Sequence, residues 1–196
     1  QYAARITARL SVGWVETMKH TRMAAGILIV GLLVAPIGAG AESPESKSAQ
    51  TFVQDFYTWY GQEEKNEHDM ALSDYAIKTK PQLFTAAIVQ GLKEDEAAQA
   101  KVPGEVVGLD FDPILNAQDD CGPYKAGKVK VMGATYRVEL FDHCSDSKPA
   151  RPAVIAAVQK QKGSWVFVDF IYPGSGDLFS ELQSLKKERE KSGKRE

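Results

Sequence analysis

The segment Ser164–Tyr172, with the sequence SWVFVDFIY, constrains the fold of this 196-residue chain more than any other, because it is apolar at nearly every position. Successive side chains of a strand point to opposite faces. Strict alternation gives this strand two apolar faces, one with Trp165, Phe167 and Ile171 and one with Val166, Val168, Phe170 and Tyr172. Such a strand must be covered on both sides. We expect the covers to be helices from the first half of the chain and a helix at its end.

The first half of the chain has the apolar spacing of helices. Residues 46–64 predict an amphipathic helix, with an apolar face of Ala49, Phe52, Val53, Phe56, Tyr57 and Tyr60, and Trp59 beside it. An aromatic stripe of this kind is more typical of a core than of a ligand site. After a charged connector, a second helix is expected from Pro81 to about Ala100, because proline is favoured in the first helical turn.

The pattern changes to strands and turns after Pro103-Gly104. Residues 128–140 predict a hairpin across Gly133-Ala134, and residues 152–161 and 164–172 predict a second pair. A closing helix then carries Leu178, Leu182 and Leu185 on one face. The predicted fold class is therefore α+β, with N-terminal helices packed on a curved antiparallel sheet and a C-terminal helix.

Residues 18–41 have the pattern of a secretory signal peptide. A basic start at Met18 is followed by an apolar run and by Ala39-Gly40-Ala41, which predicts cleavage after Ala41. The apolar run is about 14 residues, shorter than the roughly 20 that span a membrane. Residues 1–17 are expected to be a misassigned upstream extension. Since no cysteine follows the cleavage site, we expect a periplasmic protein without a stable membrane anchor.

The remaining chain is expected to hold a disordered lead-in at 42–48, a single α+β domain at 49–186 and a charged flexible tail at 187–196. The whole chain has 24 basic and 26 acidic side chains. Residues 1–41 contain four of the basic side chains and one of the acidic ones, so the mature protein carries a net charge of −5. This charge argues against a nucleic-acid-binding protein.

The segment 106–124, called the acidic loop below, is the candidate ligand-binding site. Its oxygen donors are Asp110, Asp112, Asn116, Asp119 and Asp120. Calcium binds such donors, but the spacing lacks the glycine and the final glutamate of a calcium loop. We therefore expect neither a metal nor a cofactor. The competing interpretation is structural, because aspartate and asparagine side chains accept hydrogen bonds from nearby amides and shape turns.

Cys121 and Cys144 are the two cysteines of the chain, and export favours their pairing in a disulfide. A reactive thiol is the alternative. Asp169 is a further candidate binding residue, because it interrupts an apolar strand and strict alternation puts it on the face of Trp165 and Phe167. Burial there would raise its pKa, although an aspartate near a strand end more often accepts a backbone amide. No motif assigns a catalytic residue.

Four motifs resemble a known family when they are taken in order. They are Phe56-Tyr57-x-Trp59-Tyr60, the stretch 108–113 with 116–119, Tyr136-x-Val138, and 165–170 with Tyr172-Pro173. This set, over roughly 49–186, resembles the bacterial family called domain of unknown function 3828. The resemblance implies a small exported or lipid-anchored envelope protein with a cone-shaped fold similar to nuclear transport factor 2. It implies no established activity and no catalytic residues.

These observations favour a non-catalytic binding module that holds a small molecule in the cone or a protein partner on the open face of the sheet. Two alternatives stay open, a periplasmic immunity or inhibitor protein and a small enzyme that uses a buried carboxylate. An enclosed polar pocket containing Asp169 would favour a small-molecule binder or an enzyme. A filled cone with an exposed acidic loop would favour a protein partner.

Overall fold

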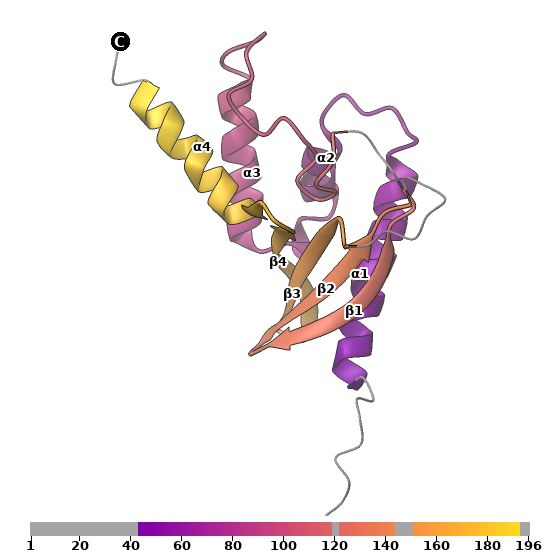
Figure 1. Cartoon of the computed structure of the whole chain (residues 1–196). Coiled ribbons are helices and arrows are strands. Elements are labelled where there is room, and N and C mark those ends of the chain that lie inside the picture. The colour runs from indigo at the N-terminus through magenta and orange to yellow at the C-terminus, as the bar shows by residue number, and fades with distance from the viewer. Residues whose placement is uncertain (1–42, 119–121, 144–150, 193–196) are drawn as a thin grey trace, which may run out of the picture. The chain divides into compact units, whose positions relative to one another are not determined.

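The computed structural model describes residues 43–118, 122–143 and 151–192. Within these residues the chain forms α1 (Pro44–Glu63), α2 (Leu72–Thr79), the short 3-10 helix η1 (Pro81–Leu83), α3 (Ala86–Gln99), β1 (Lys125–Met132), β2 (Thr135–Phe141), β3 (Val154–Gln161), β4 (Ser164–Tyr172), β5 (Gly176–Asp177) and α4 (Leu178–Ser192). Helices come first, an antiparallel sheet follows, and a helix closes the chain (Figure 1). The predicted α+β fold class is confirmed.

The five strands pair in chain order, β1-β2-β3-β4-β5, and every pair is antiparallel. Both predicted hairpins are present. The first turns at Gly133, which has a φ of 62°, and the second turns at Lys162 and Gly163, with φ values of 51° and 87°. Two-residue hairpin turns require such positive φ values, because only these turns match the twist of the strands.

A bulge in β4 changes the faces that strict alternation predicts. Ala157 pairs with Asp169 and Val158 pairs with Phe167, so Val168 is an extra residue in β4. The extra residue puts Phe167 and Phe170 on the same face, where their rings stack with centroids 5.2 Å apart. Asp169 therefore faces away from Phe167, and its predicted position on the same face is wrong.

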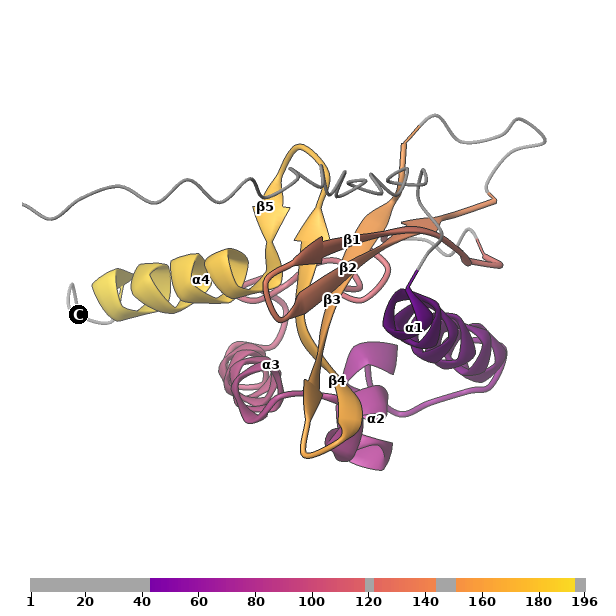
Figure 2. The same cartoon turned by 90° about the horizontal axis from the view of Figure 1, so that it is seen from below.

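Helix α1 covers one face of the sheet, whereas α4 lies on the other side (Figure 2). The predicted aromatic stripe of α1 forms the core beneath it. Phe56 packs on Phe167 of β4 with ring centroids 4.7 Å apart, and Phe52 lies 5.1 Å from the same ring. Burial of these side chains supplies the main free energy that joins helix and sheet.

The predicted disordered lead-in is wrong for residues 44–48, because α1 begins at Pro44. The hydroxyl of Ser43 accepts a hydrogen bond from the amide of Ser46 at 3.0 Å, and Pro44 occupies the first helical position. Such a cap satisfies an amide that would otherwise lack a partner in the first turn. The helix therefore starts before its first core residue, Ala49.

Two helical predictions need correction between Glu63 and Gln99. The charged connector contains the helix α2, and the helix expected from Pro81 is interrupted at Phe84 and Thr85. Phe84 forms a parallel bridge with Phe167, and the Thr85 amide donates to the Phe167 carbonyl at 2.9 Å. This pairing with the edge of β4 pulls two residues out of helical geometry, so α3 starts at Ala86.

The predicted flexible tail is also wrong in part, because α4 continues to Ser192. Its last turns are held by Arg189, which pairs with the buried carboxylate of Asp95 on α3 at 2.6 Å. Among the described helices, none is long and apolar enough to cross a membrane. The predicted disulfide between Cys121 and Cys144 lies outside the described residues.

Candidate functional site

The carboxylate of Asp112 organises the acidic loop. One oxygen, Oδ1, accepts the amides of Ile114 at 2.8 Å and Leu115 at 3.0 Å. The other, Oδ2, accepts the hydroxyl of Tyr60 on α1 at 2.6 Å. Three donors thus converge on a single side chain, which closes the turn and ties it to the long helix. This arrangement matches the structural interpretation of the loop.

Asn116 has a comparable role at the other side of the turn. Its φ is 56°, a left-handed conformation that asparagine tolerates better than most residues. Its side-chain amide donates to the carbonyl of Ala153, just before β3, at 2.9 Å. Asp110, by contrast, is exposed. Asp119 and Asp120 lie outside the described residues.

Two buried tyrosines hold the apolar part of the loop. Tyr57 of α1 donates its hydroxyl to the carbonyl of Ile114 at 2.6 Å, and Tyr172 of β4 donates to the carbonyl of Pro113 at 3.0 Å. Burial raises the pKa of both phenols, so they remain protonated donors. The sequence predicts these tyrosines only as core residues. The hydroxyl that each carries on an otherwise apolar side chain was the signal for a second role.

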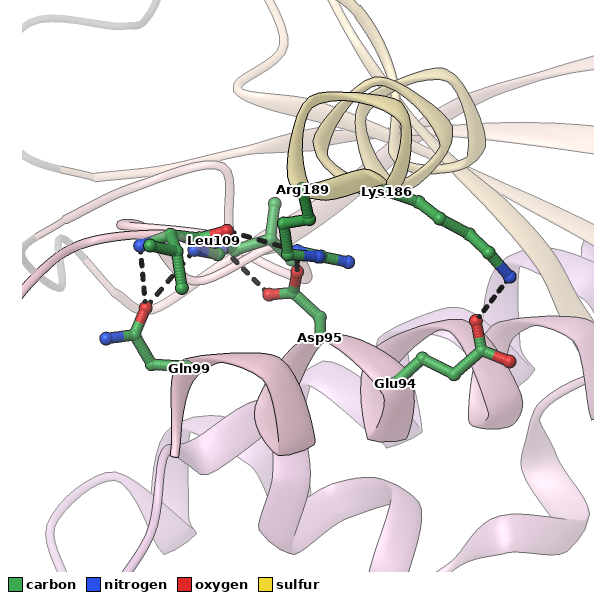
Figure 3. A network of polar contacts seen from close by, with 8 residues as sticks. Glu94, Asp95, Gln99, Leu109, Lys186 and Arg189 are labelled. Carbon is green, nitrogen blue, oxygen red and sulfur yellow. Dashed lines mark hydrogen bonds and ion pairs between the residues drawn. The ribbon is translucent and has the colours of Figure 1, made fainter. Parts of the chain in front are cut away.

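The start of the acidic loop is held between α3 and α4 (Figure 3). Asp95, only 6% exposed, accepts the amide of Leu109 at 2.8 Å and the guanidinium of Arg189 at 2.6 Å. Gln99 accepts the amides of Val107 at 3.0 Å and Gly108 at 3.2 Å. A Cβ on Gly108 would lie 2.5 Å from the Asp95 carboxylate, so this close approach requires glycine.

A polar pocket of about 270 Å³ lies beside the acidic loop, at the end of α1. It is lined by Asp112, Leu115, Ala117 and Gln118 of the loop and by Glu64, Asn66, His68, Met70 and Leu72. His68 is already engaged, because its Nε2 lies 2.9 Å from the Glu63 carbonyl and its ring packs 4.0 Å from Tyr75. No group of three metal-binding side chains is present among the described residues.

Asp169 of β4 lies near the first turn of α4, on the side of the sheet away from α1. Its carboxylate accepts the amide of Phe170 at 2.9 Å, and the amide of Phe179 also stabilises its charge. Burial and the neighbouring Asp177 nevertheless raise the pKa of Asp169 to about 6. Asp177 caps α4 through the amide of Ser180 at 2.8 Å. Asp169 lines neither the polar pocket nor any of the three other cavities described around the sheet and α1.

A second carboxyl with a raised pKa, Asp74 of α2, was not predicted from the sequence. Burial is the main cause, and the nearby carboxylates of Glu96, Asp95 and Asp112 add to it, so that its pKa is about 6. These four acids come from α2, α3 and the acidic loop. Nothing local in the sequence marks Asp74, because its neighbours are distant along the chain.

In the described residues, buried side chains occupy the centre of the region between α1 and the sheet. Phe167 and Phe170 are completely buried, and Phe84 packs on Phe167 with centroids 5.5 Å apart. Trp165 closes one end, where its indole NH donates to Ser48 of α1 at 3.0 Å. The candidate residues therefore do not converge on one chamber. Asp112 and Asn116 share the loop, whereas Asp169 lies apart from them.

Comparison with protein-family models, with curated proteins and with solved structures found no match to the chain. The resemblance to domain of unknown function 3828, and with it the fold similar to nuclear transport factor 2, stays a prediction.

Proposed function

We propose that this protein is an exported, periplasmic, non-catalytic module that binds another protein through its surface. The observation that carries the proposal is the filled interior, in which Phe56, Phe84, Phe167 and Phe170 occupy the space where a cone-shaped fold would hold a small molecule. Small molecules bind in concave pockets, so a centre occupied by aromatic rings in the described residues favours recognition through the outer surface.

The hydrogen bonds of the candidate carboxylates also support a non-catalytic role. Asp112 accepts hydrogen bonds from two amides and a phenol, so both of its oxygens already hold the loop in place. Asp169 has a pKa suitable for proton transfer, but it lies outside the described cavities. A general base must reach the proton that it abstracts.

The location in the periplasm is supported by the signal-peptide pattern of residues 18–41. Membership of the domain of unknown function 3828 family is part of the same proposal, and it is supported by the order of the four motifs. Both would place the protein in the bacterial envelope.

The test is to produce the full chain with a C-terminal tag in a Gram-negative host and to isolate it from the periplasm. We expect a mature N-terminus at Glu42 and, after incubation with envelope extract, a protein partner in a fixed ratio by native mass spectrometry. A tagged periplasmic protein of similar size and charge is the control. A bound small molecule in place of a protein, or failure of export, would contradict the proposal.

A further inference from the structure

Strand β1 is an edge of the sheet, since β2 pairs with it on one side alone. Met132 and Thr135 flank the two-residue turn and form a hydrogen-bonded pair. Hydrogen-bonded pairs alternate with non-hydrogen-bonded pairs along two antiparallel strands, so the alternate pairs Val131–Tyr136 and Val129–Val138 are not hydrogen-bonded. In such alternate pairs the amide and carbonyl groups point away from the partner strand. The peptide groups of Val129 and Val131 therefore point outward from the free edge.

Two glutamines of α1 form hydrogen bonds with the outward backbone groups at the start of β1. The side chain of Gln54 accepts the amide of Ala126 at 2.8 Å and donates to the carbonyl of Tyr124 at 3.1 Å. Gln50 donates to the carbonyl of Gly127 at 2.6 Å. In the described part of the chain, no side chain does the same for Val129 or Val131. The outward groups of these two residues are available to another chain.

An apolar groove lies beside the same strand. It has a volume of about 490 Å³ and is lined in part by Ala126, Gly127 and Phe141. A Cβ on Gly127 would lie 2.6 Å from the Phe141 ring, so the absence of a side chain keeps this ring accessible beside β1. At the far end of the strand, Val131 and Met132 are 48% and 45% exposed. Apolar surface is thus exposed at both ends of β1.

The charge of this edge is basic. Lys125, Lys128 and Lys130 lie along β1, and no carboxylate in the described residues forms an ion pair with them. Among the described residues that line the groove, Glu139 is the one acid, and His143 is also present. The whole chain has a net charge of −2, so this local basic strip contrasts with the rest of the molecule. Lysines on an edge disfavour pairing with a second identical edge.

We propose that β1 binds an extended, acidic segment of a partner protein by strand addition. The partner's backbone would hydrogen-bond to Val129 and Val131, its acidic side chains would meet the three lysines, and an apolar side chain would enter the groove at Phe141. This mode of recognition uses main-chain hydrogen bonds for affinity and side-chain pockets for specificity. The inference rests on the proposed function, because it names the class of protein segment that the module recognises.

The first test uses the full chain and two fluorescent synthetic peptides, one of alternating glutamate and valine and one of alternating lysine and valine. We expect fluorescence anisotropy to show binding of the acidic peptide alone, with affinity that falls as salt is raised. The double variant Lys128→Glu and Lys130→Glu should lose the acidic peptide and gain the basic one. Lys78→Glu on α2, an exposed lysine away from β1, is the matched control and should leave binding unchanged.

The second test addresses the backbone. Val131→Pro removes an outward amide, and proline is tolerated on an edge strand whose amide faces away from the ladder. We expect at least about tenfold weaker binding of the acidic peptide with an unchanged circular dichroism spectrum. If Val131→Pro does not fold, protection of the Val129 and Val131 amides from hydrogen exchange by the peptide replaces this measurement.

Three results would overturn the inference: equal binding of both peptides, no binding of either, or a wild-type dimer that the lysine reversal strengthens. A protein partner that is captured in the periplasmic experiment and still binds the lysine variant would refute this docking surface while leaving the proposed function in place. If no partner is captured and the acidic peptide still binds, the result would count against the proposed function and leave the docking surface in place.

Discussion

At the residue scale, the acidic loop contains aspartates that look alike in sequence and differ in the structure. Asp112 accepts three hydrogen bonds, whereas the side chain of Asp110 is exposed. We predict that Asp112→Ala lowers the free energy of unfolding by about 2–3 kcal/mol, because it leaves buried donors without partners. Asp110→Ala should change it by less than about 0.5 kcal/mol. Urea unfolding of both variants checks the prediction, and similar losses would contradict it.

The raised pKa of Asp74 predicts a dependence of stability on pH. Its pKa is about 6 in the folded protein and about 4 in the unfolded chain, so folding favours the protonated form. Its contribution to stability is therefore fully present below about pH 4 and is lost as the pH rises through about 6. Asp74→Asn should raise the melting temperature at pH 7.5 and leave it nearly unchanged at pH 4.

Differential scanning calorimetry at the two pH values measures this effect, which we expect to be about 1 kcal/mol after solvent screening of a half-buried group. Asp55→Asn, at an exposed position on α1, is the control for the loss of a negative charge. A stabilisation of Asp74→Asn that is equal at pH 4 and pH 7.5 would show that titration of Asp74 is not its cause.

Single residues were predictable from sequence where their role is local. Asp112 accepts amides two and three residues further along, and Asn116 adopts a left-handed turn conformation; the composition of the loop indicated such turn-shaping roles. Asp169 was placed on the wrong face because a bulge has no clear sequence signal. Asp95 was missed because its partners, Leu109 and Arg189, lie 14 and 94 residues away.

At the element scale, α4 is attached to α3 by one buried contact and one exposed contact. Arg189 pairs with the buried Asp95 at 2.6 Å, and Lys186 pairs with the exposed Glu94 at 3.0 Å. Truncating one partner of a buried pair leaves an uncompensated charge, whereas exposed pairs contribute little. We predict that Arg189→Ala lowers the free energy of unfolding by about 2–3 kcal/mol and that Lys186→Ala lowers it by less than about 0.5 kcal/mol.

Hydrogen exchange locates the same effect along the chain. In Arg189→Ala we expect faster exchange in the last turns of α4 and at the amide of Leu109, which shares the Asp95 carboxylate. Lys186→Ala should show wild-type rates at Leu109. Unchanged exchange at Leu109 in Arg189→Ala would mean that Asp95 holds the loop without the arginine.

Elements whose ends depend on neighbouring residues were predictable, and elements whose ends depend on distant contacts were not. The two hairpins follow from their turn residues, Gly133 and Lys162-Gly163. The break before α3 depends on the pairing of Thr85 with Phe167, which is 82 positions further along the chain. The extension of α4 into its charged end likewise depends on Asp95, so a count of charges wrongly indicated a flexible tail.

At the scale of the whole molecule, aromatic side chains occupy the centre of the region between α1 and the sheet in the described residues, and this packing favours a protein partner over a small molecule. Phe167 is fully buried at the centre of this region, in contact with the rings of Phe52, Phe56, Phe84 and Phe170. Phe167→Ala should lower the free energy of unfolding by about 3–5 kcal/mol, because it leaves a cavity that the neighbours cannot fill completely.

Such a cavity also gives a direct test of whether the native interior is filled. Benzene at saturation should raise the melting temperature of Phe167→Ala, since an apolar cavity binds small apolar molecules, and it should leave the wild-type protein unchanged. Phe167→Leu, with a smaller cavity, should respond less and still fold if the alanine variant does not. A rise in the wild-type melting temperature would reveal an accessible internal site, and a small molecule would then replace a protein as the expected ligand.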